Sequence, residues 1–313
     1  MKKRIHTEQA PKPVYIIGAG AIGKVLAVCL SSNGKKVVLL RGSVDNGETH
    51  RENIRVTLLS GEIIETGVTI DTLSNYTSLD GLVVLCNKSY GNAALADALK
   101  DKIGCSPIII LQNGLGVEQV FIDFPAVYRC VLFATSQPVS DTILSFKPVA
   151  LSPIGRIRGG DENSLGLIAG LLNTPYFGFR PEPDIQPVIW KKAIINSVFN
   201  SICPLLETDN GIFHRNPQAL QMAESLVSEC LCVAKEQGVN LSPEEVMDSL
   251  LMISRSSDGQ FISTLQDIRN HRPTEIATLN LAIAGMAATE QTVIQTSLLG
   301  RLTLLKSQLS MNC

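Results

Sequence analysis

The sequence predicts an α/β fold in which an N-terminal Rossmann-type, doubly wound parallel sheet precedes an all-helical C-terminal domain. Short apolar runs alternate with helix-compatible segments in the first half of the chain, which is typical of a parallel sheet covered by helices. A glycine-rich turn joins the first run to the first helical segment. Beyond Pro181 and Pro183 only long helix-compatible segments follow, and 313 residues is the length of about two domains.

The first strand is expected at 14–18, where an apolar run ends in glycine, and it is followed by a helix and, after an Asn-Gly turn, a second strand. This is the minimal parallel unit. In order, the expected elements of the first half are strands at 14–18, 37–40, 82–86, 108–111 and 131–134 and helices at 21–30, 93–102 and 117–124.

The paired prolines near 180–184 disfavour helix and mark a domain boundary, so we expect domains at 1–182 and 183–313. The helices expected after the boundary are at 185–206, 217–237, 243–253, 274–289 and 293–310. The last of these are apolar enough either to form a homodimer interface or to close the core of their own domain.

Composition excludes several classes of function. The 27 basic and 29 acidic side chains give a net charge of −2, so no basic field for nucleic acid is expected. Apolar runs are too short to span a membrane, and the polar residues after Met1-Lys2-Lys3-Arg4 indicate a loose N-terminal arm rather than a signal peptide. The eight cysteines form no C-x-x-C pair, which predicts no metal site and a reducing, cytoplasmic compartment.

Residues Gly18-Ala19-Gly20-Ala21-Ile22-Gly23 form a G-x-G-x-x-G motif between the first expected strand and helix. Gly18 permits a tight turn, Gly20 lets the backbone approach a pyrophosphate, and Gly23 lets helix and strand pack closely. The helix N-terminus would add N–H donors for the phosphates. The alternative is a glycine-rich turn that binds nothing.

The end of the second strand bears on which dinucleotide binds. NAD-binding units usually carry an acidic residue there, but this chain has Arg41 and no acid until Asp45. A guanidinium group can hold a 2′-phosphate through two hydrogen bonds. We therefore expect NADP(H), with an ordinary surface arginine as the alternative.

Lys192, Asn196 and Asn200 are spaced i, i+4 and i+8 on an expected helix. The rest of this helix is made apolar by Ile194, Ile195, Val198, Phe199 and Ile202. Buried asparagines need hydrogen-bond partners, so the spacing suggests a polar cavity, although a solvent-facing stripe is equally compatible with it. A partly buried lysine can donate a proton to a developing alkoxide, and amides can bind a hydroxyl, carbonyl or carboxylate group.

Two further polar segments fit this interpretation. Asn113 follows an apolar strand, at the carboxyl edge where open sheets bind ligands. Ser263 and Glu275 begin and end a polar segment in which Thr274-Glu275 follows Pro273. Asn113 before glycine is equally explained as a turn residue, and Glu275 as a first-turn acid that complements a helix dipole.

Taken together, these residues resemble the ketopantoate reductase (2-dehydropantoate 2-reductase) family. The resemblance covers nearly the whole chain, in the expected order, and the last two matching segments are the most specific. The matching segments are G-A-G-A-I-G at 18–23, L-Q-N-G-L-G at 111–116, W-K-K-A-I-I-N-S-V-F-N at 190–200 and S-T-L-Q-D-I-R-N-H-R-P-T-E at 263–275.

The resemblance implies an NADP-dependent oxidoreductase acting on CH–OH groups, with an NADP-binding first domain and a substrate-binding, catalytic second domain. Its reaction would reduce ketopantoate to (R)-pantoate in pantothenate and coenzyme A synthesis. The implied roles are proton donation by Lys192, positioning of that lysine and cofactor contact by Glu275, cofactor contact by Lys88 and Asn113, and substrate binding by Asn113, Asn196, Asn200, Asn210 and Ser263.

The chain departs from the family pattern at its N-terminal arm and at 135–139. Two alternatives therefore stay open. One is a paralogous NADPH-dependent reductase of another branched 2-keto acid or of an imine. The other, of a different class, is a protein that senses NADP(H) without catalysis, although such a protein has no need of a buried acid.

Overall fold

The computed structural model describes residues 12–312 and divides into two compact units. The first unit runs up to Gln112 and from Val120 to Pro183, and the second comprises Asn113–Gln119 and the chain from Asp184 onward. The segment at 113–119 thus belongs to the second unit, although it lies far from the expected boundary in sequence. The predicted N-terminal arm and Cys313 lie outside the described residues.

The first unit contains a mixed sheet with three α-helices among its described residues. Its strands are β1 (Val14–Ile17), β2 (Val37–Leu40), β3 (His50–Leu58), β4 (Ile63–Asp71), β5 (Leu82–Leu85), β6 (Ile108–Ile110), β7 (Ala126–Cys130), β8 (Ala134–Pro138), β9 (Ile143–Pro148), β10 (Ser152–Gly159) and β11 (Phe179–Pro181). Its helices are α1 (Ala21–Ser32), α2 (Asn92–Leu99) and α3 (Glu162–Leu172), and its 3₁₀ turns are η1 (Leu73–Asn75) and η2 (Ser89–Gly91). A third 3₁₀ turn, η3 (Gln119–Phe121), begins at the last residue of the segment 113–119 and continues into the first unit.

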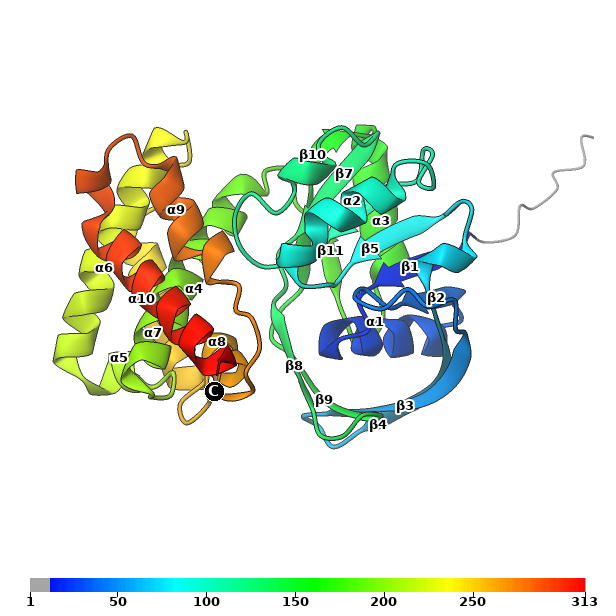
Figure 1. Ribbon diagram of the computed structural model, residues 1–313, viewed down its shortest axis with the longest axis horizontal. Coiled ribbons are helices and arrows are strands. Elements are labelled where there is room, and N and C mark those ends of the chain that lie inside the picture. Colours follow the sequence, from blue (N-terminus) through cyan, green and yellow to red (C-terminus); the bar gives the residue numbers. More distant parts are fainter. Residues whose placement is uncertain (1–11, 313) are drawn as a thin grey trace, which may run out of the picture. The chain divides into compact units, whose positions relative to one another are not determined.

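The centre of the sheet is parallel and has β1 in the middle. The full order is β11-β10-β7-β6-β5-β1-β2-β4-β3-β9-β8. Val14 pairs with Val37 of β2 on one side and with Leu82 of β5 on the other. The parallel block from β4 to β7 is the predicted doubly wound sheet, and Figure 1 shows β1, β2 and β5 side by side within the unit.

Antiparallel pairs extend this block on both sides. β3 pairs antiparallel with β4, β8 with β9, and β10 with β7. Helix α1 contacts β3, β4, β8 and β9, so this half of the sheet curves around one helix (Figure 1). The helix residues from Val25 to Leu30 are accordingly fully buried.

Two elements predicted for the first half are wrong. No strand covers 131–134, because β7 ends at Cys130 and β8 starts only at Ala134. The helix expected at 117–124 is also absent, and only the short η3 forms there. Gly114 and Gly116 have φ values of +94° and +71°, so the chain turns just before this segment instead of starting a helix.

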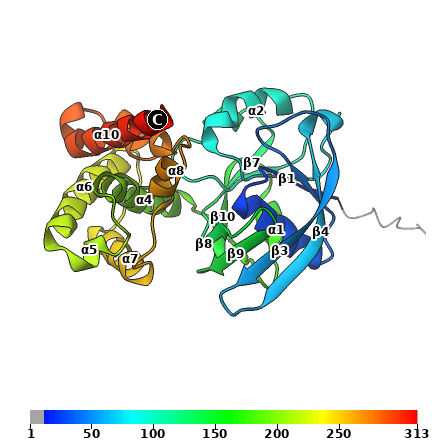
Figure 2. The same cartoon turned by 60° about the horizontal axis from the view of Figure 1, so that its bottom comes forward.

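The second unit is helical throughout its described elements. These are α4 (Gln186–Leu206), α5 (Ile212–Arg215), α6 (Pro217–Glu236), α7 (Pro243–Ser256), α8 (Ser263–Arg269), η4 (Ile276–Thr278), α9 (Asn280–Met286), η5 (Glu290–Val293) and α10 (Ile294–Met311). Pro187, Pro217 and Pro243 lie in the first turns of α4, α6 and α7, where a missing N–H costs nothing. Figure 2 shows α4 lying among the other helices of this unit.

The helix predicted at 274–289 is wrong as a single element. Leu279 has φ −111° and ψ −106°, which separates η4 from α9, and α9 ends at Met286. Helix α8 was not predicted, because the polar segment at 263–269 carries few apolar residues. Both differences bear on the candidate site, since Ser263 begins α8 and Glu275 precedes η4.

Some general properties can be read from the part of the chain that the structure describes. Within 12–312 no helix is both long and apolar enough to cross a membrane. The same residues contain no group of three or more His, Cys, Asp or Glu side chains arranged to hold a metal ion. The seven described cysteines are free thiols.

Candidate active site

Four of the predicted cofactor positions follow strands of the parallel block. Gly18 follows β1, Arg41 follows β2, Lys88 follows β5 after two residues, and Asn113 follows β6 after two residues. Since these strands are parallel neighbours, their carboxyl ends lie on one edge of the sheet. After β1 the chain continues to β2, which pairs with β1 on one side, whereas β5 pairs with β1 on its other side. This edge is therefore the topological switch point, where open sheets bind ligands.

The glycine-rich turn has the backbone geometry that the motif predicts. Gly18 has φ +115°, and a Cβ there would lie 2.4 Å from the backbone nitrogen of Asn87. A Cβ on Gly23 would lie 2.0 Å from the Gly18 carbonyl oxygen, so the helix packs directly on the turn. A Cβ on Gly20 would meet nothing within 4 Å. The space beside Gly20 is therefore open to a ligand.

Helix α1 begins at this turn without a side-chain cap and without an acidic residue in its first turn. Gly20 is its N-cap residue, and the intervening residues Ala19, Ala21 and Ile22 are small or apolar. The first N–H groups of a helix have no partner within the helix, and the helix dipole favours negative charge there. The turn can thus bind a phosphate group through its backbone.

Three amide side chains, which sequence reasoning missed, connect the ends of β5 and β6. Asn92 Nδ2 donates to Gln112 Oε1 at 2.8 Å, and Gln112 Nε2 donates back to Asn92 Oδ1 at 2.7 Å. Gln112 Nε2 also donates to the Asn87 carbonyl oxygen at 2.9 Å. This network orients the loop that carries the partly buried Lys88, and the buried Oδ1 of Asn87 is left without a hydrogen bond.

Arg41 lies inside the loop that follows β2 rather than extending from it. Its guanidinium group donates to Asn46 Oδ1 at 3.1 Å and to the Glu48 carbonyl oxygen, while its buried Nε has no partner. The Glu48 carboxylate lies 3.6 Å from Arg41 Nη1 with its side chain 71% exposed. The structure therefore places an acidic group beside Arg41 that the sequence interpretation did not consider.

A buried carboxylate at the end of β4 holds this loop. Asp71 accepts hydrogen bonds from Thr49 Oγ1, Asn75 Nδ2, Tyr76 Oη and the Thr72 N–H, at 2.7 to 2.8 Å. Burial alone would raise the pKa of Asp71, but these hydrogen bonds outweigh it and lower the pKa. These hydrogen bonds hold the loop that carries Arg41 in place. Asp71 is therefore a residue that positions this loop, and no sequence motif indicated it.

Asp45 makes a second anchor for the same loop. Its carboxylate accepts from the Ser74 N–H at 2.9 Å. Hydrogen bonding with the Ser74 side chain is the main reason why the pKa of Asp45 is lowered, and the Ser74 N–H lowers it further. Asp45 is the first acidic residue after β2, and it is engaged in the loop. It is therefore poorly placed to act as the ribose-binding acid of an NAD site.

In the second unit, Lys192, Asn196 and Asn200 lie on helix α4 as their spacing predicts. Lys192 and Asn196 are partly buried, and Asn200 is 4% exposed. The Asn200 amide oxygen accepts from Thr264 Oγ1 at 2.7 Å and from Ser263 Oγ at 3.4 Å. Asn200 thus connects α4 to the start of α8. It brings the exposed Ser263 to the side of α4 that carries the polar stripe of Lys192, Asn196 and Asn200.

The segment that carries Asn113 packs on the segment that carries Glu275. The Leu115 N–H donates to the Thr278 carbonyl oxygen at 2.8 Å, and a Cβ on Gly114 would lie 2.4 Å from Thr278 Oγ1. Thr278 in turn donates from Oγ1 to the Glu275 carbonyl oxygen at 3.0 Å. Two predicted site residues that are distant in sequence therefore lie on neighbouring segments of the second unit.

Asn210 is held by a polar network on both sides. Its N–H donates to the Gln260 carbonyl oxygen at 2.9 Å, and its own carbonyl oxygen accepts from Ser254 Oγ at 2.7 Å. The buried side-chain oxygen of Asn210 has no hydrogen bond. The backbone is thus fixed while the amide oxygen stays available to a donor.

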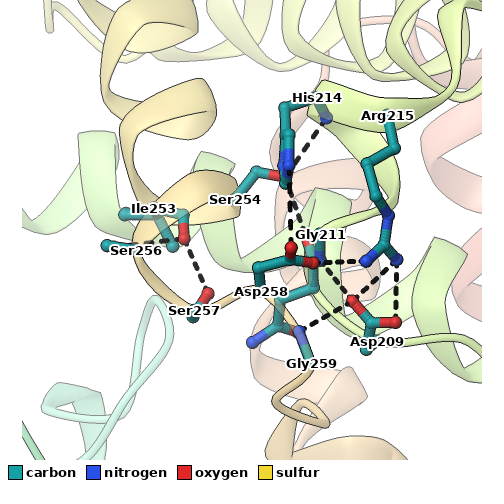
Figure 3. A network of polar contacts seen from close by, with 11 residues as sticks. Asp209, Gly211, His214, Arg215, Ile253, Ser254, Ser256, Ser257, Asp258 and Gly259 are labelled. Atoms are coloured by element: carbon teal, nitrogen blue, oxygen red, sulfur yellow. Dashed lines mark hydrogen bonds and ion pairs between the residues drawn. The ribbon is translucent and has the colours of Figure 1, made fainter.

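Asp209 and Arg215 form the strongest part of this network (Figure 3). Arg215 Nη2 donates to both Asp209 oxygens at 2.9 and 2.8 Å, and Nη1 donates to Asp258. The N–H groups of Gly211 and Gly259 also donate to Asp209 Oδ1. Burial alone would raise the pKa of Asp209, but these donors lower it to about 2.

Replacing Asp209 with asparagine is expected to lower the free energy of unfolding by about 1–3 kcal/mol at pH 7, because Arg215 and two N–H groups lose a charged acceptor. An unfolded aspartate has a pKa of about 3.9, so the unfolded chain binds the proton first as the solution is acidified. The contribution of Asp209 is therefore complete above about pH 5 and is lost as the pH falls from about 4 to 2.

Urea unfolding of the wild type and of D209N at pH 7, 4 and 3 tests this expectation, and the difference between the two should shrink at pH 3. Asp258→Asn is the matched control, because Asp258 binds the same arginine but its side chain is 44% exposed, against 21% for Asp209. Equal losses in the two variants would contradict the assignment of Asp209 as the central acceptor.

Comparison with known proteins places the chain in a family. The sequence-family model described as ketopantoate reductase PanE/ApbA matches residues 14–143. The family model described as its C-terminal part matches residues 184–303. A curated relative, 2-dehydropantoate 2-reductase from Streptococcus pyogenes, is 26% identical over 278 residues, which cover 86% of this chain and 89% of that protein.

Two solved structures have the same fold. The dimeric ketopantoate reductase from Staphylococcus aureus has a TM-score of 0.79 at 21% identity and covers 95% of this chain and 99% of its own. D-mandelate dehydrogenase, solved with NADH and anilino(oxo)acetate, has a TM-score of 0.80 at 21% identity with the same coverage. With both family models matched in order along its two units, the chain belongs to the ketopantoate reductase family.

Proposed function

We propose that this protein is an NADPH-dependent reductase that converts ketopantoate (2-dehydropantoate) to (R)-pantoate, in the synthesis of pantothenate and coenzyme A. The observation that carries the proposal is the stripe on helix α4, where Lys192 and Asn196 are partly buried beside Asn200, which holds Ser263. A proton donor, beside amide and hydroxyl groups that can bind a carboxylate or hydroxyl group, suits the reduction of a 2-keto acid by a bound hydride donor. The similarity to 2-dehydropantoate 2-reductases supports this substrate.

The residues of the first unit fit a phosphorylated dinucleotide. The open space beside Gly20 and the uncapped start of α1 would take the pyrophosphate, and the buried Nε of Arg41, which lacks a partner, could take part in binding a 2′-phosphate. Lys88 and Asn113 would contact the cofactor nearer its nicotinamide end. When bound, NADPH supplies the hydride that reduces the keto carbon.

The protein's own residues would provide the proton and the alignment. Lys192 Nζ would donate a proton to the keto oxygen as the alkoxide develops, with Glu275 setting the position of the lysine. Asn196 and Ser263 would bind the substrate, with Ser263 on its carboxylate group. Asn200 would act on the substrate partly by fixing Ser263, and the free amide oxygen of Asn210 would accept from a substrate hydroxyl.

Self-association is part of the proposal. The similar reductase from Staphylococcus aureus is dimeric, and the present chain is proposed to form a homodimer as well. Its other partner is the small 2-keto acid substrate, with no role for nucleic acid or a membrane.

A second candidate function is reduction of a different branched 2-keto acid. The similarity in fold to D-mandelate dehydrogenase favours it, because oxidised mandelate is a 2-keto acid and the same fold therefore serves another substrate. The candidate shares Lys192 and the glycine-rich turn with the leading proposal, so only the substrate distinguishes them.

The test is the rate of NADPH oxidation at 340 nm with ketopantoate, phenylglyoxylate and 2-ketoisovalerate, each repeated with NADH. Ketopantoate with NADPH is expected to give a kcat/KM at least 10-fold above every other pair. A higher value with another keto acid would replace the leading proposal by the second one. Absence of turnover with all three acids, despite NADPH binding, would contradict both.

The cofactor arm of this experiment uses two variants of the loop after β2. Arg41→Ala is expected to raise the KM for NADPH about 10- to 100-fold and to leave that for NADH nearly unchanged, because only NADPH carries the 2′-phosphate. Glu48→Gln is expected to lower the KM for NADPH, since it removes a negative charge 3.6 Å from Arg41. A loss in R41A that is equal for both cofactors would contradict this role of Arg41.

A further inference from the structure

The hydroxyl group of Ser254 bonds away from its own helix. A serine in a helix usually donates its hydroxyl proton to a carbonyl oxygen one turn earlier. Two other serines of this part of the chain do so, since Ser249 Oγ and Ser257 Oγ each donate to the carbonyl oxygen four residues before them, at 2.8 and 2.6 Å. Ser254 is fully buried and donates instead to the Asn210 carbonyl oxygen. Its hydroxyl group therefore connects α7 to the loop between α4 and α5.

The hydrogen-bonding capacity of Ser254 is filled by Asn210 and His214. A hydroxyl group has one proton to donate and two lone pairs with which to accept. The Asn210 carbonyl oxygen takes the proton at 2.7 Å. The His214 N–H lies 3.3 Å from Ser254 Oγ, and His214 Nδ1 lies 3.1 Å from it (Figure 3). Since the proton of Ser254 is already used, His214 Nδ1 carries a proton and donates it to Oγ.

This assignment gives the His214 ring a defined role. Its Nδ1–H occupies a lone pair of Ser254 Oγ, so the hydroxyl proton stays directed at Asn210. The other ring nitrogen, Nε2, lies 3.9 Å from Asp258 Oδ2, and Asp258 accepts a hydrogen bond from Arg215 (Figure 3). His214 thus sets the direction in which Ser254 donates.

Both peptide groups that flank Asn210 are held in place. In the peptide group that follows it, Ser254 binds the carbonyl oxygen and the Gly211 N–H donates to Asp209 Oδ1 at 2.7 Å. In the peptide group that precedes it, the Asn210 N–H donates to the Gln260 carbonyl oxygen at 2.9 Å. A residue has only two soft backbone rotations, and the orientation of its two peptide groups fixes both. Only the side-chain rotations of Asn210 are left.

The side chain of Asn210 ends in a buried acceptor. The residue is 6% exposed, and its Oδ1 has no hydrogen bond to any residue that the structure describes. A buried acceptor without a donor is unfavourable, and a ligand that brings a donor removes this penalty. The donor has to approach along a line that the backbone of Asn210 sets, and Ser254 holds that backbone.

We propose that Ser254, oriented by His214, is a positioning residue that aims the Asn210 amide oxygen at a hydroxyl group of the substrate. The pair thereby makes the site selective for 2-keto acids that carry such a group. The inference rests on the proposed function, in which Asn210 accepts from a substrate hydroxyl. Ser254 acts through Asn210, because its own hydroxyl group has no hydrogen-bonding capacity left for a ligand.

Two substrates that differ only in this hydroxyl group test the proposal. 3,3-Dimethyl-2-oxobutanoate is ketopantoate with hydrogen in place of the hydroxyl group. With the full chain and saturating NADPH, the wild type is expected to have a kcat/KM about 10-fold or more higher for ketopantoate. Ser254→Ala is expected to lower this preference at least about 5-fold, through a higher KM for ketopantoate. Its kcat, its NADPH affinity and its values for the dimethyl acid should stay within a factor of about two.

Matched variants separate positioning from general damage. Ser257→Ala removes a hydroxyl group at the same end of α7 that is bonded to its own helix, and it should keep the preference. His214→Asn and His214→Leu have nearly equal shapes, but only the asparagine keeps an N–H group near the position of Nδ1. His214→Leu is expected to lose the preference as Ser254→Ala does, and His214→Asn to keep most of it. This pair tests the same contact at a partly exposed side chain if Ser254→Ala does not fold.

A preference for the hydroxyl group that survives in Ser254→Ala and in His214→Leu would overturn the inference and leave the proposed function standing. Equal losses of kcat/KM for the two acids, or a similar loss of preference in Ser257→Ala, would also overturn it, because they would indicate damage to the unit as a whole. A wild type that reduces ketopantoate no better than the dimethyl acid would overturn both the inference and the choice of ketopantoate as the substrate.

Discussion

Replacing Lys192 with alanine is expected to lower kcat for ketopantoate reduction by about 10²- to 10⁴-fold, the usual contribution of a general acid. Without the Nζ proton, the alkoxide that develops on the keto oxygen would have to be protonated by water. The affinity for NADPH is expected to change little, because the glycine-rich turn and Arg41 lie in the first unit. Single-turnover rates with NADPH in excess measure the chemical step, and fluorescence titration measures NADPH binding.

Lys191→Ala provides the matched control for this substitution. Lys191 is the preceding residue of the same helix and is also partly buried, but it points about 100° away from the stripe. Its replacement should leave kcat within a factor of about three. Lys192→Arg should restore little activity, since a guanidinium group gives up its proton far less readily than an ammonium group. A kcat in K192A within a factor of three of the wild type would remove Lys192 from the mechanism.

The parts of the fold that were predicted from the sequence are those with a local signal. The run at 14–17 followed by Gly18, Gly20 and Gly23 has a fixed spacing whose backbone requirements can be stated in advance, and the structure has that geometry. The same is true of helix α4, where Lys192, Asn196 and Asn200 recur at four-residue intervals in a largely apolar helix. The prolines near 181–183 likewise indicated the change to helical structure.

The parts that were missed depend on contacts between residues distant in sequence. Nothing near Asp71 indicates that its carboxylate gathers Thr49, Asn75 and Tyr76 beneath the loop of Arg41. The segment at 113–119 belongs to the second unit, where Leu115 and Gly114 pack on Thr278, more than 160 residues later. Helix α8 forms where Asn200 accepts hydrogen bonds from its first turn, and this contact has no signature in the segment itself.

Substitution of two glycines in the turn should separate cofactor binding from folding. Gly20 has φ −78° and ψ −177°, which alanine adopts without strain, and its Cβ would meet nothing within 4 Å. Gly20→Ala is therefore expected to keep or slightly raise the free energy of unfolding, by up to about 1 kcal/mol. The added methyl group would occupy the space proposed for the pyrophosphate, so NADPH affinity should fall at least 10-fold.

Gly23→Ala is expected to lower both the free energy of unfolding and the affinity for NADPH. Its Cβ would lie 2.0 Å from the Gly18 carbonyl oxygen, a backbone atom that can move only if α1 shifts against β1. Since α1 is the buried helix around which the sheet curves, we expect a loss of about 2–4 kcal/mol in unfolding free energy together with loss of NADPH binding. Urea unfolding and NADPH titration of each variant provide the two readouts.

Gly166→Ala on α3 is the control for Gly20→Ala, because its Cβ would also meet nothing within 4 Å and the site is remote from the turn in sequence. It should show the same small change in stability with unchanged NADPH affinity. The contrast between these two variants decides the role of the turn, because both add one methyl group to open space in the same unit. If Gly20→Ala bound NADPH as tightly as Gly166→Ala, the open space beside Gly20 would not be where the phosphates lie, and the turn would be left with the role of packing α1 against the sheet.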